Sequence, residues 1–359
     1  MEYIFGIFLV MIGIYSNGRM SVSSRQKYYI FILLYVIFLL GLRYEVGGDT
    51  IGYMSIYDRT PTFTELFKTD FTESRFEPAY LFICAFCRLF TNEFWLTQLI
   101  MAAITNCCIF IFLYRYCKNP FVGVFFYLIL YCLYFTTEIM RESAAVGIFL
   151  VNYRNLERHK WIKYYLISLF SVSFQYSAIV IWLFPLVKYL RFNILYLALI
   201  CGFLAITPLV QQLNEMLAIS SITGRVGHYI QGAEELNMNW RIAELIKSGF
   251  PPVAALLLLK KYKYQSPFKS FALLQLLFCA GAFAIPLIFS RFSNFTVLFV
   301  TVIIANLLST KRIPQFLRSL FVCAILLMQI SYYSRMAYRW FPYVSVFAPH
   351  EIIREVPDK

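Results

Sequence analysis

The chain has 359 residues, of which 60% are hydrophobic, 19% aromatic and only 14% charged. Soluble domains carry about 25% charged residues, so most of this chain is not expected to face water. The composition excludes soluble enzymes, nucleic-acid readers and disordered proteins. The long apolar runs predict an all-α polytopic integral membrane protein.

The net charge of +13 does not indicate nucleic-acid binding here, because the cytoplasmic loops of membrane proteins collect Lys and Arg. The nine cysteines lie mostly within apolar runs, where they are expected to pack as small hydrophobic side chains. The three histidines are scattered, and the sequence has no metal-site or nucleotide-binding motif. We therefore expect no cofactor, no metal and no nucleic acid.

About twelve apolar stretches are predicted to cross the membrane and to form a single transmembrane domain over residues 1–359. In chain order they are 3–16, 28–42, 94–114, 121–139, 142–153, 162–176, 177–190, 194–210, 241–259, 268–289, 292–309 and 315–333. A further apolar stretch at 78–90 is short and contains Arg88. It is predicted to be a re-entrant or interfacial helix, because it is too short to span.

The distribution of Lys and Arg predicts the orientation of the chain. One set of loops carries eighteen Lys and Arg with a single acid, Glu157, whereas everything else carries fourteen basic and eighteen acidic residues. Loops rich in Lys and Arg stay in the cytoplasm. The first set is therefore assigned to the cytoplasm, and both termini are predicted to lie outside.

Two segments on the predicted outer face are long enough to contain a binding or catalytic site, residues 43–77 and residues 211–240. In the first, a glycine turn would present Asp49 and Tyr53 near the membrane surface, although a plain surface turn is the alternative. The second segment contains a Gly-Arg-Val-Gly-His-Tyr run. This run is expected either to bind an anion or a sugar, or only to give the loop a defined conformation. Its polar members are Arg225, His228 and Tyr229.

Two arginines, Arg141 and Arg291, lie between apolar stretches at the predicted outer face, and Arg43 ends another stretch there. Ionisable groups at membrane depth usually face an aqueous cavity or a partner. A single arginine at a helix end can instead extend to the lipid headgroups. Three guanidinium groups around one outward-facing cavity would bind a phosphate-rich anion through forked hydrogen bonds.

Gln175 falls in the hinge between two short predicted helices, 162–176 and 177–190. Short helix pairs of this kind can line a cavity at intermediate depth. A plain tight hairpin is the alternative interpretation.

Read in order, these positions resemble the EpsG family of bacterial exopolysaccharide polymerases, which is related to the Wzy-type polymerases. The resemblance runs from about residue 30 to about residue 347. It depends on an ordered set of short motifs: Arg43…Gly47-x-Asp49…Tyr53, Glu77-Pro78, Met140-Arg141-Glu142-Ser143-Ala144-Ala145, Phe174-Gln175-Tyr176-Ser177-Ala178, Gly224-Arg225…Tyr229, Arg291 and Pro342-Tyr343.

The chain departs from the family pattern at two positions. Glu142 stands where the family commonly has Gln, and Gln175 stands where it commonly has His. If that His is the base that activates the acceptor hydroxyl, Gln175 cannot replace it, because an amide is not basic near neutral pH. Either the base lies elsewhere, with Asp49, Glu142 and His228 as candidates, or position 175 only orients sugar hydroxyls.

The resemblance implies a GT-C-like, metal-independent glycosyltransferase of the bacterial cytoplasmic (inner) membrane. It would transfer a glycan from undecaprenyl diphosphate onto a lipid-linked repeat unit at the outer face, as in capsule or O-antigen synthesis. Its partners would be the lipid-linked donor and acceptor, the bilayer and a chain-length regulator. Arg141, Arg291, Arg43 and Arg225 would meet the charge of the leaving diphosphate, and Asp49 could take the acceptor proton.

Two alternatives share much of this chemistry. A transporter or flippase for lipid-linked oligosaccharides is compatible with the helix count, but the sequence lacks the internal repeat expected of one. An O-antigen-type ligase would use the same donor with a different acceptor.

Overall fold

The computed structural model describes residues 2–68, 71, 74, 76–189, 238–284 and 286–349. Within these residues the fold is helical, apart from an isolated antiparallel bridge between Arg43 and Ser345. The chain divides into two compact units. The first comprises residues 1–179 and 319–359, and the second comprises residues 180–318.

The first unit contains most of the helices. In chain order they are α1 (Glu2–Ser16), α2 (Val22–Gly41), α3 (Thr50–Tyr57), α4 (Phe63–Leu66), α5 (Pro78–Cys87), α6 (Trp95–Tyr116), α7 (Pro120–Tyr127), the π-helical turns η1 (Leu128–Cys132) and η2 (Tyr134–Glu138), α8 (Met140–Glu157), α9 (Trp161–Phe174) and most of α17 (Gln315–Met336), which is followed by η5 (Ala337–Arg339).

Local sequence explains where several of these helices begin. Ser21 caps α2 by accepting a hydrogen bond from the Ser24 N–H. Asn119 caps α7 in the same way, and Pro120 occupies the first helical position, where its missing N–H costs nothing. Pro78 likewise begins α5 directly after Glu77. This placement fixes Glu77 at the start of a helix.

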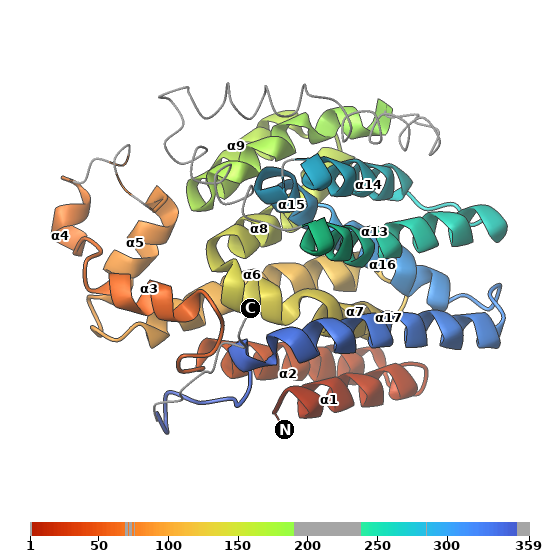
Figure 1. Cartoon of the computed structure of the whole chain (residues 1–359), viewed down its shortest axis with the longest axis horizontal. Coiled ribbons are helices and arrows are strands. Elements are labelled where there is room, and N and C mark those ends of the chain that lie inside the picture. The colour runs from red at the N-terminus through yellow and green to blue at the C-terminus, as the bar shows by residue number, and fades with distance from the viewer. Residues whose placement is uncertain are drawn as a thin grey trace. The chain divides into compact units, whose positions relative to one another are not determined.

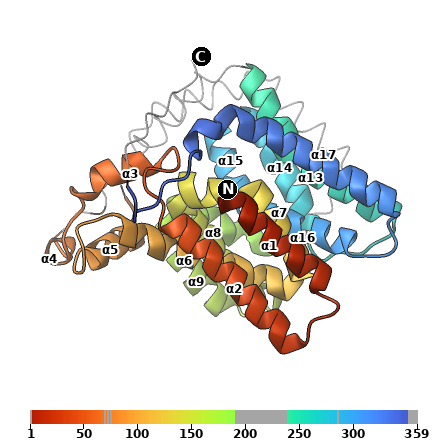
Figure 2. The ribbon, with the colours of Figure 1, turned by 90° about the horizontal axis from the view of Figure 1, so that it is seen from below.

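The long helices of the first unit pack as consecutive neighbours. α6 lies between α2 and α8, and α8 lies between α6 and α9 (Figure 1). Figure 2 shows α1 and α2 lying side by side, with α3, α4 and α5 gathered at one end of the long helices. α3 and α4 therefore lie at that end, and both are too short to span a membrane.

Buried polar side chains connect these helices. The Tyr29 hydroxyl donates to the Phe110 carbonyl at 2.8 Å, and the Gln98 amide donates to the Gly41 carbonyl at 3.0 Å. Both bonds join α2 to α6. In an apolar surrounding such bonds stabilise helix pairs by about 0.6 kcal/mol on average, and they fix the helix register.

The second unit holds the last part of η3 (Tyr176–Tyr189), α13 (Met238–Lys261), α14 (Lys269–Ala284), α15 (Pro286–Asn294), α16 (Val297–Leu308) and the first residues of α17. α14 packs against α13, α15 and α16. The rings of Phe271 and Phe299 stack with centroids 4.0 Å apart, and a side-chain hydrogen bond joins Thr296 to Gln275. These contacts hold α14 against α16.

Most of the predicted stretches coincide with helices. By length and composition, two described helices can cross a membrane, Trp95–Tyr116 and Gln315–Arg339, and the bent pair Ile288–Asn294 with Val297–Leu308 can add a third. Several other apolar helices have 10–17 residues. The count of twelve spans therefore stays a prediction. The predicted span 194–210 and nearly all of the 211–240 segment lie outside the described residues.

The boundary predicted between residues 289 and 292 is wrong. Arg291 lies in the last turn of α15, which continues to Asn294, and α16 begins at Val297. The described break beside Arg291 therefore follows Asn294 and does not fall at the arginine itself.

The short helix predicted at 78–90 is present as α5. Its ten residues rise about 15 Å, half of a typical hydrocarbon core. Arg88 follows it directly and donates to the backbone carbonyls of Thr60 and Asp58, so this guanidinium is anchored to the 43–77 segment. The length and the anchor favour a helix that does not span.

Candidate functional site

The site is built around a break between two helical segments. The π-helical turn η2 ends at Glu138, Ile139 leaves helical geometry with φ −119° and ψ 43°, and α8 begins at Met140. π-helical turns inside helices are rare and occur frequently at functional sites. We call Glu138 to Arg141 the 138–141 corner. Its two charged residues, Glu138 and Arg141, each bind a different part of the chain.

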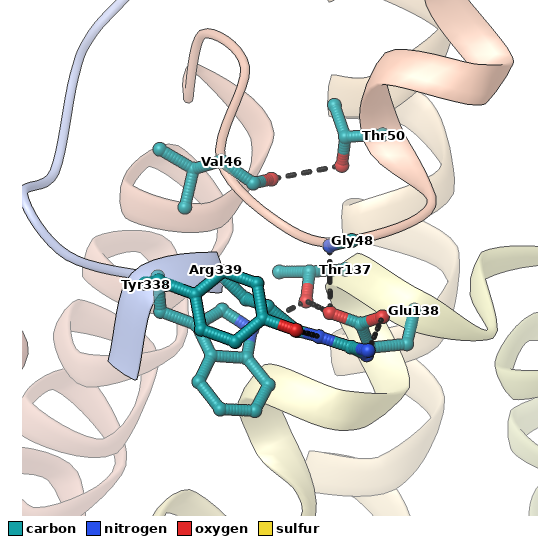
Figure 3. Close-up of polar contacts among 8 residues, drawn as sticks. Val46, Gly48, Thr50, Thr137, Glu138, Tyr338 and Arg339 are labelled. Atoms are coloured by element: carbon teal, nitrogen blue, oxygen red, sulfur yellow. Dashed lines mark hydrogen bonds and ion pairs between the residues drawn. The ribbon is translucent and has the colours of Figure 1, made fainter. Parts of the chain in front are cut away.

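Glu138 holds two distant segments together, as Figure 3 shows. Its Oε1 accepts a hydrogen bond from the Gly48 N–H at 2.8 Å, and its Oε2 pairs with Arg339 Nη1 at 3.1 Å. The neighbouring Thr137 hydroxyl accepts from the Trp340 indole N–H at 2.9 Å. Residues 48 and 339–340 are therefore joined at one carboxylate and its neighbour.

Two glycines make this close approach possible. Gly47 has φ +106°, a conformation that side chains disfavour, and its N–H donates to the Arg339 carbonyl at 2.8 Å. At Gly48, a Cβ would lie 2.6 Å from Glu138 Oε2. Gly47 is thus favoured by its backbone conformation, and Gly48 by the contact of its backbone with the carboxylate (Figure 3).

Arg141 forms the second set of contacts at the corner. Its Nη1 pairs with Glu77 Oε2, and its Nε–H donates to the Tyr53 hydroxyl at 3.1 Å. The guanidinium carbon lies 4.9 Å from the Phe76 ring centroid and 5.8 Å from those of Tyr53 and Tyr80. Arg141 is therefore held by one carboxylate inside an aromatic enclosure, with 16% of its side chain exposed.

The partners of Arg141 come from α3, from the end of the 43–77 segment and from α5. Tyr53 lies on α3, and its ring stacks with Phe76 at a centroid distance of 6.0 Å. Burial raises the pKa of the Tyr53 phenol, so it stays neutral near neutral pH. Glu77 precedes Pro78 at the start of α5, with 5% of its side chain exposed. The ion pair is consequently shielded from bulk water.

Arg43 has a different environment from the one predicted. It is 1% exposed, its Nε–H donates to the Val46 carbonyl at 2.9 Å and its Nη2 donates to the Thr136 carbonyl at 3.0 Å. Further contacts reach Leu40 O and Thr50 Oγ1. The guanidinium is thus directed at backbone and hydroxyl oxygens of the fold. This geometry makes Arg43 an anchor of the 43–50 turn, and its predicted contact with a phosphate stays a prediction.

The candidate bases differ in exposure. Asp49 is exposed and directly precedes α3, one residue after the Gly48 contact to Glu138. Glu142 is buried in the first turn of α8, next to Arg141 in the chain. Gln175 is buried where α9 ends, and its N–H donates to the Ser171 carbonyl at 3.3 Å. Of these three, Asp49 is the carboxylate that solvent reaches.

The remaining predicted residues are not brought to the corner by described contacts. Arg291 belongs to α15 of the second unit. Arg225, His228 and Tyr229 lie outside the described residues. Among the residues that the structure describes, no group of three or more His, Cys, Asp or Glu side chains could hold a metal ion.

A largely apolar cavity of about 500 Å³ also lies in the first unit. Its walls come from α1, α2, the helical run after Pro120, and α17. Phe341 lines it, and the preceding Trp340 bonds to Thr137 beside the corner. Gln329 also lines it, is 3% exposed and has an Oε1 without a hydrogen bond in the described part of the chain. A mainly apolar cavity of this size suits a hydrocarbon chain.

Sequence reasoning did not select Glu77, Glu138, Arg339 and Trp340 as site residues. Glu77 belongs to a motif already noted, and Glu138 stands three residues before Arg141. A signal was therefore present in the sequence at these two positions. Arg339 pairs with Glu138, which lies 201 positions earlier in the chain. A local sequence pattern cannot predict a pairing over that distance.

The chain was also compared with known proteins. No curated protein and no solved structure matches it significantly. The sequence model of the EpsG family matches residues 2–345, which is nearly the whole chain. The match covers both units and every residue of the 138–141 corner and its described partners. The chain therefore belongs to the EpsG family, which is related to the Wzy-type exopolysaccharide polymerases.

Proposed function

We propose that this protein is a polysaccharide polymerase of the bacterial cytoplasmic membrane. It transfers a growing glycan from undecaprenyl diphosphate onto a lipid-linked repeat unit at the outer face of the membrane. Membership of the EpsG family supports a membrane polysaccharide polymerase-type role in general. The donor, the acceptor and the side of the membrane are the finer parts of the proposal.

In the proposed reaction, an acceptor hydroxyl attacks the anomeric carbon of the donor glycan. The new glycosidic C–O bond forms while the bond between that carbon and the diphosphate oxygen breaks. The proton of the hydroxyl passes to a base, and undecaprenyl diphosphate leaves with the electron pair. Catalysis then depends on holding the developing negative charge and on removing one proton.

The observation that carries the proposal is the pair of arginines associated with the 47–53 turn. Arg339 is placed beside Gly48 by Glu138, and Arg141 is placed against Tyr53 by Glu77. About 35% of the Arg339 side chain is exposed. Within the described part of the chain, no hydrogen bond engages Nη2 of Arg141. Two pre-oriented guanidinium groups can bind a diphosphate through forked hydrogen bonds and stabilise it as it leaves.

Asp49 is the base that best fits this arrangement. It lies on the same turn, between the Gly48 and Tyr53 contacts, and it is exposed. A carboxylate there can accept the proton of a sugar hydroxyl that enters from solvent. Glu142 and His228 remain the alternative bases, and Gln175 is proposed to orient sugar hydroxyls.

The remaining predicted residues and the apolar cavity also have proposed roles in binding the substrate. Arg291, Arg225 and Tyr229 are proposed to contact the phosphates or the glycan, while Arg43 fixes the turn. The apolar cavity lined by Phe341 is proposed to take part of the undecaprenyl chain. Because the arginines neutralise the leaving group, the reaction as proposed needs no metal.

Deletion of the gene in its host tests this function, with lipid-linked and surface glycans separated on a gel. We expect long polymer to disappear and single repeat units to accumulate on the outer leaflet. Single units retained on the cytoplasmic leaflet would instead identify a flippase. Long lipid-linked polymer that no longer reaches its final acceptor would identify a ligase, and either outcome would reject the polymerase.

A further inference from the structure

A second cavity, of about 450 Å³, lies in the first unit where α6 begins. This volume falls within the range of about 300–1,000 Å³ that is typical of small-molecule sites. Arg43, whose guanidinium is bonded to the fold, is one of its lining residues. Four aromatic residues, one carboxylate and one amide also line it: Tyr44, Phe94, Trp95, Phe347, Glu93 and Gln98. The sequence patterns did not indicate these six residues as site residues.

The cavity borders the arginine site directly. Phe94 lines the cavity, and its ring stacks on the Tyr53 ring at a centroid distance of 6.4 Å and an interplanar angle of 9°. Tyr53 in turn accepts the hydrogen bond of Arg141. Met54, the next residue after Tyr53, lines the same cavity. The stacked rings of Phe94 and Tyr53 therefore stand between a ligand in the cavity and Arg141.

One buried amide gives the cavity a hydrogen-bond acceptor. Gln98 Nε2 donates to the carbonyls of Gly41 at 3.0 Å and Arg43 at 2.7 Å. Because both partners are acceptors, the amide must present its nitrogen to them, which fixes the position of its carbonyl oxygen. Gln98 is 1% exposed and lines the cavity. Its carbonyl oxygen is the acceptor that a hydroxyl donor of a ligand would use.

Glu93 and the aromatic residues of the cavity favour a sugar over a hydrocarbon chain as its ligand. The Glu93 side chain is exposed at the edge of the cavity and accepts hydrogen bonds when ionised. Trp95 and Phe347 supply large ring faces, and Phe347 is itself exposed. A hydrocarbon chain uses ring faces but not a carboxylate and an amide acceptor. A sugar uses both, because its C–H groups pack on rings while its hydroxyls donate to oxygen atoms.

We propose that this cavity is a carbohydrate subsite that holds a sugar of the acceptor glycan beside the arginine site. The proposal rests on the proposed polymerase function, because it names the part of the acceptor that this region binds. In this proposal Trp95 and Glu93 position the sugar and determine which sugar binds. Neither residue takes part in the bond-forming step.

Binding can be measured without assuming polymerase activity. The full-length protein is placed in lipid nanodiscs, and the probe is the pool of oligosaccharides released by mild acid from the lipid-linked glycans of the host's own membranes. Saturation-transfer NMR reports which sugars bind, and a titration gives their affinity. The variants are Trp95→Ala and Glu93→Ala, with Trp161→Ala as the matched control. Trp161 is an exposed tryptophan at the start of α9, outside the cavity.

We expect the wild type and Trp161→Ala to bind oligosaccharide equally, and Trp95→Ala to bind about tenfold more weakly. Glu93→Ala changes an exposed side chain, so it keeps the test decisive if Trp95→Ala does not fold; we expect it to bind more weakly as well. Unchanged affinity in a folded cavity variant, or no binding by the wild type, would overturn the subsite. The polymerase function is judged separately from the glycans of the deletion strain, so the two proposals can fail independently.

Discussion

At the scale of single residues, Arg141 is the side chain on which the proposed chemistry depends most. Its guanidinium bonds Glu77 and Tyr53 through two different nitrogen atoms. A lysine carries the same charge but cannot reproduce this planar fork. We therefore expect Arg141→Ala and Arg141→Lys both to abolish polymer formation, as judged by glycan gels. Protein abundance is measured in the same membranes.

Lys261→Ala serves as the control for Arg141. Lys261 is the last residue of α13 and belongs to the loops assigned to the cytoplasm by charge. Its replacement should leave polymer unchanged. Full activity of Arg141→Lys would show that only a point charge is needed, and normal polymer in Arg141→Ala would remove this residue from the site.

The Glu77–Arg141 pair also has a structural consequence, because both side chains are largely buried. Removing one partner of a buried pair leaves an uncompensated charge and costs about 3–5 kcal/mol. Glu77→Ala should therefore lower the thermal stability of the solubilised protein. The double variant Glu77→Ala with Arg141→Ala should recover part of it without recovering polymer. Equal stability of the wild type and Glu77→Ala would contradict the buried pair.

At the scale of elements, the contact between the Gly47–Gly48 turn and the 138–141 corner can be tested by a single substitution. In Gly48→Ala the new Cβ would lie 2.6 Å from Glu138 Oε2, so either the turn or the carboxylate must move and the contact between them is disturbed. We expect polymer to decrease strongly, because Asp49 and Tyr53 follow on the same turn.

Gly52→Ala is the matched control for Gly48→Ala. Gly52 lies four residues later on α3, and an added Cβ there meets nothing within 4 Å. Alanine at a helical position is also more favourable than glycine by about 0.5–1 kcal/mol. Polymer and stability should be maintained in Gly52→Ala. Equal activity of the two variants would show that the contact of the turn with Glu138 is dispensable.

Helix boundaries also show how far sequence patterns reach. The predicted stretch 94–114 corresponds to α6 at Trp95–Tyr116, and 3–16 corresponds to α1, because apolar runs and caps are local features. The prediction failed near Arg291, which lies inside α15 and not between two helices. The charge of Arg291 suggested a helix boundary, but the helix continues to Asn294.

At the scale of the whole molecule, the site could be predicted only in part. Arg141 and Tyr53 were selected from local motifs, and the structure brings them together. The partners Glu138 and Arg339 are 201 positions apart, and their pairing depends on the fold of the first unit. Arg43 was selected by its charge, and its burial against the turn that follows it could not be predicted from the sequence pattern.

The central claim is that the protein extends glycans on a lipid diphosphate, and reconstitution tests it most directly. Purified wild type and Arg141→Ala are placed in proteoliposomes with lipid-linked repeat units extracted from the host. We predict that the wild type produces longer lipid-linked glycans and releases one undecaprenyl diphosphate for each unit added, whereas Arg141→Ala does neither. Movement of intact single units across the membrane without extension, or equal extension by both proteins, would contradict the account.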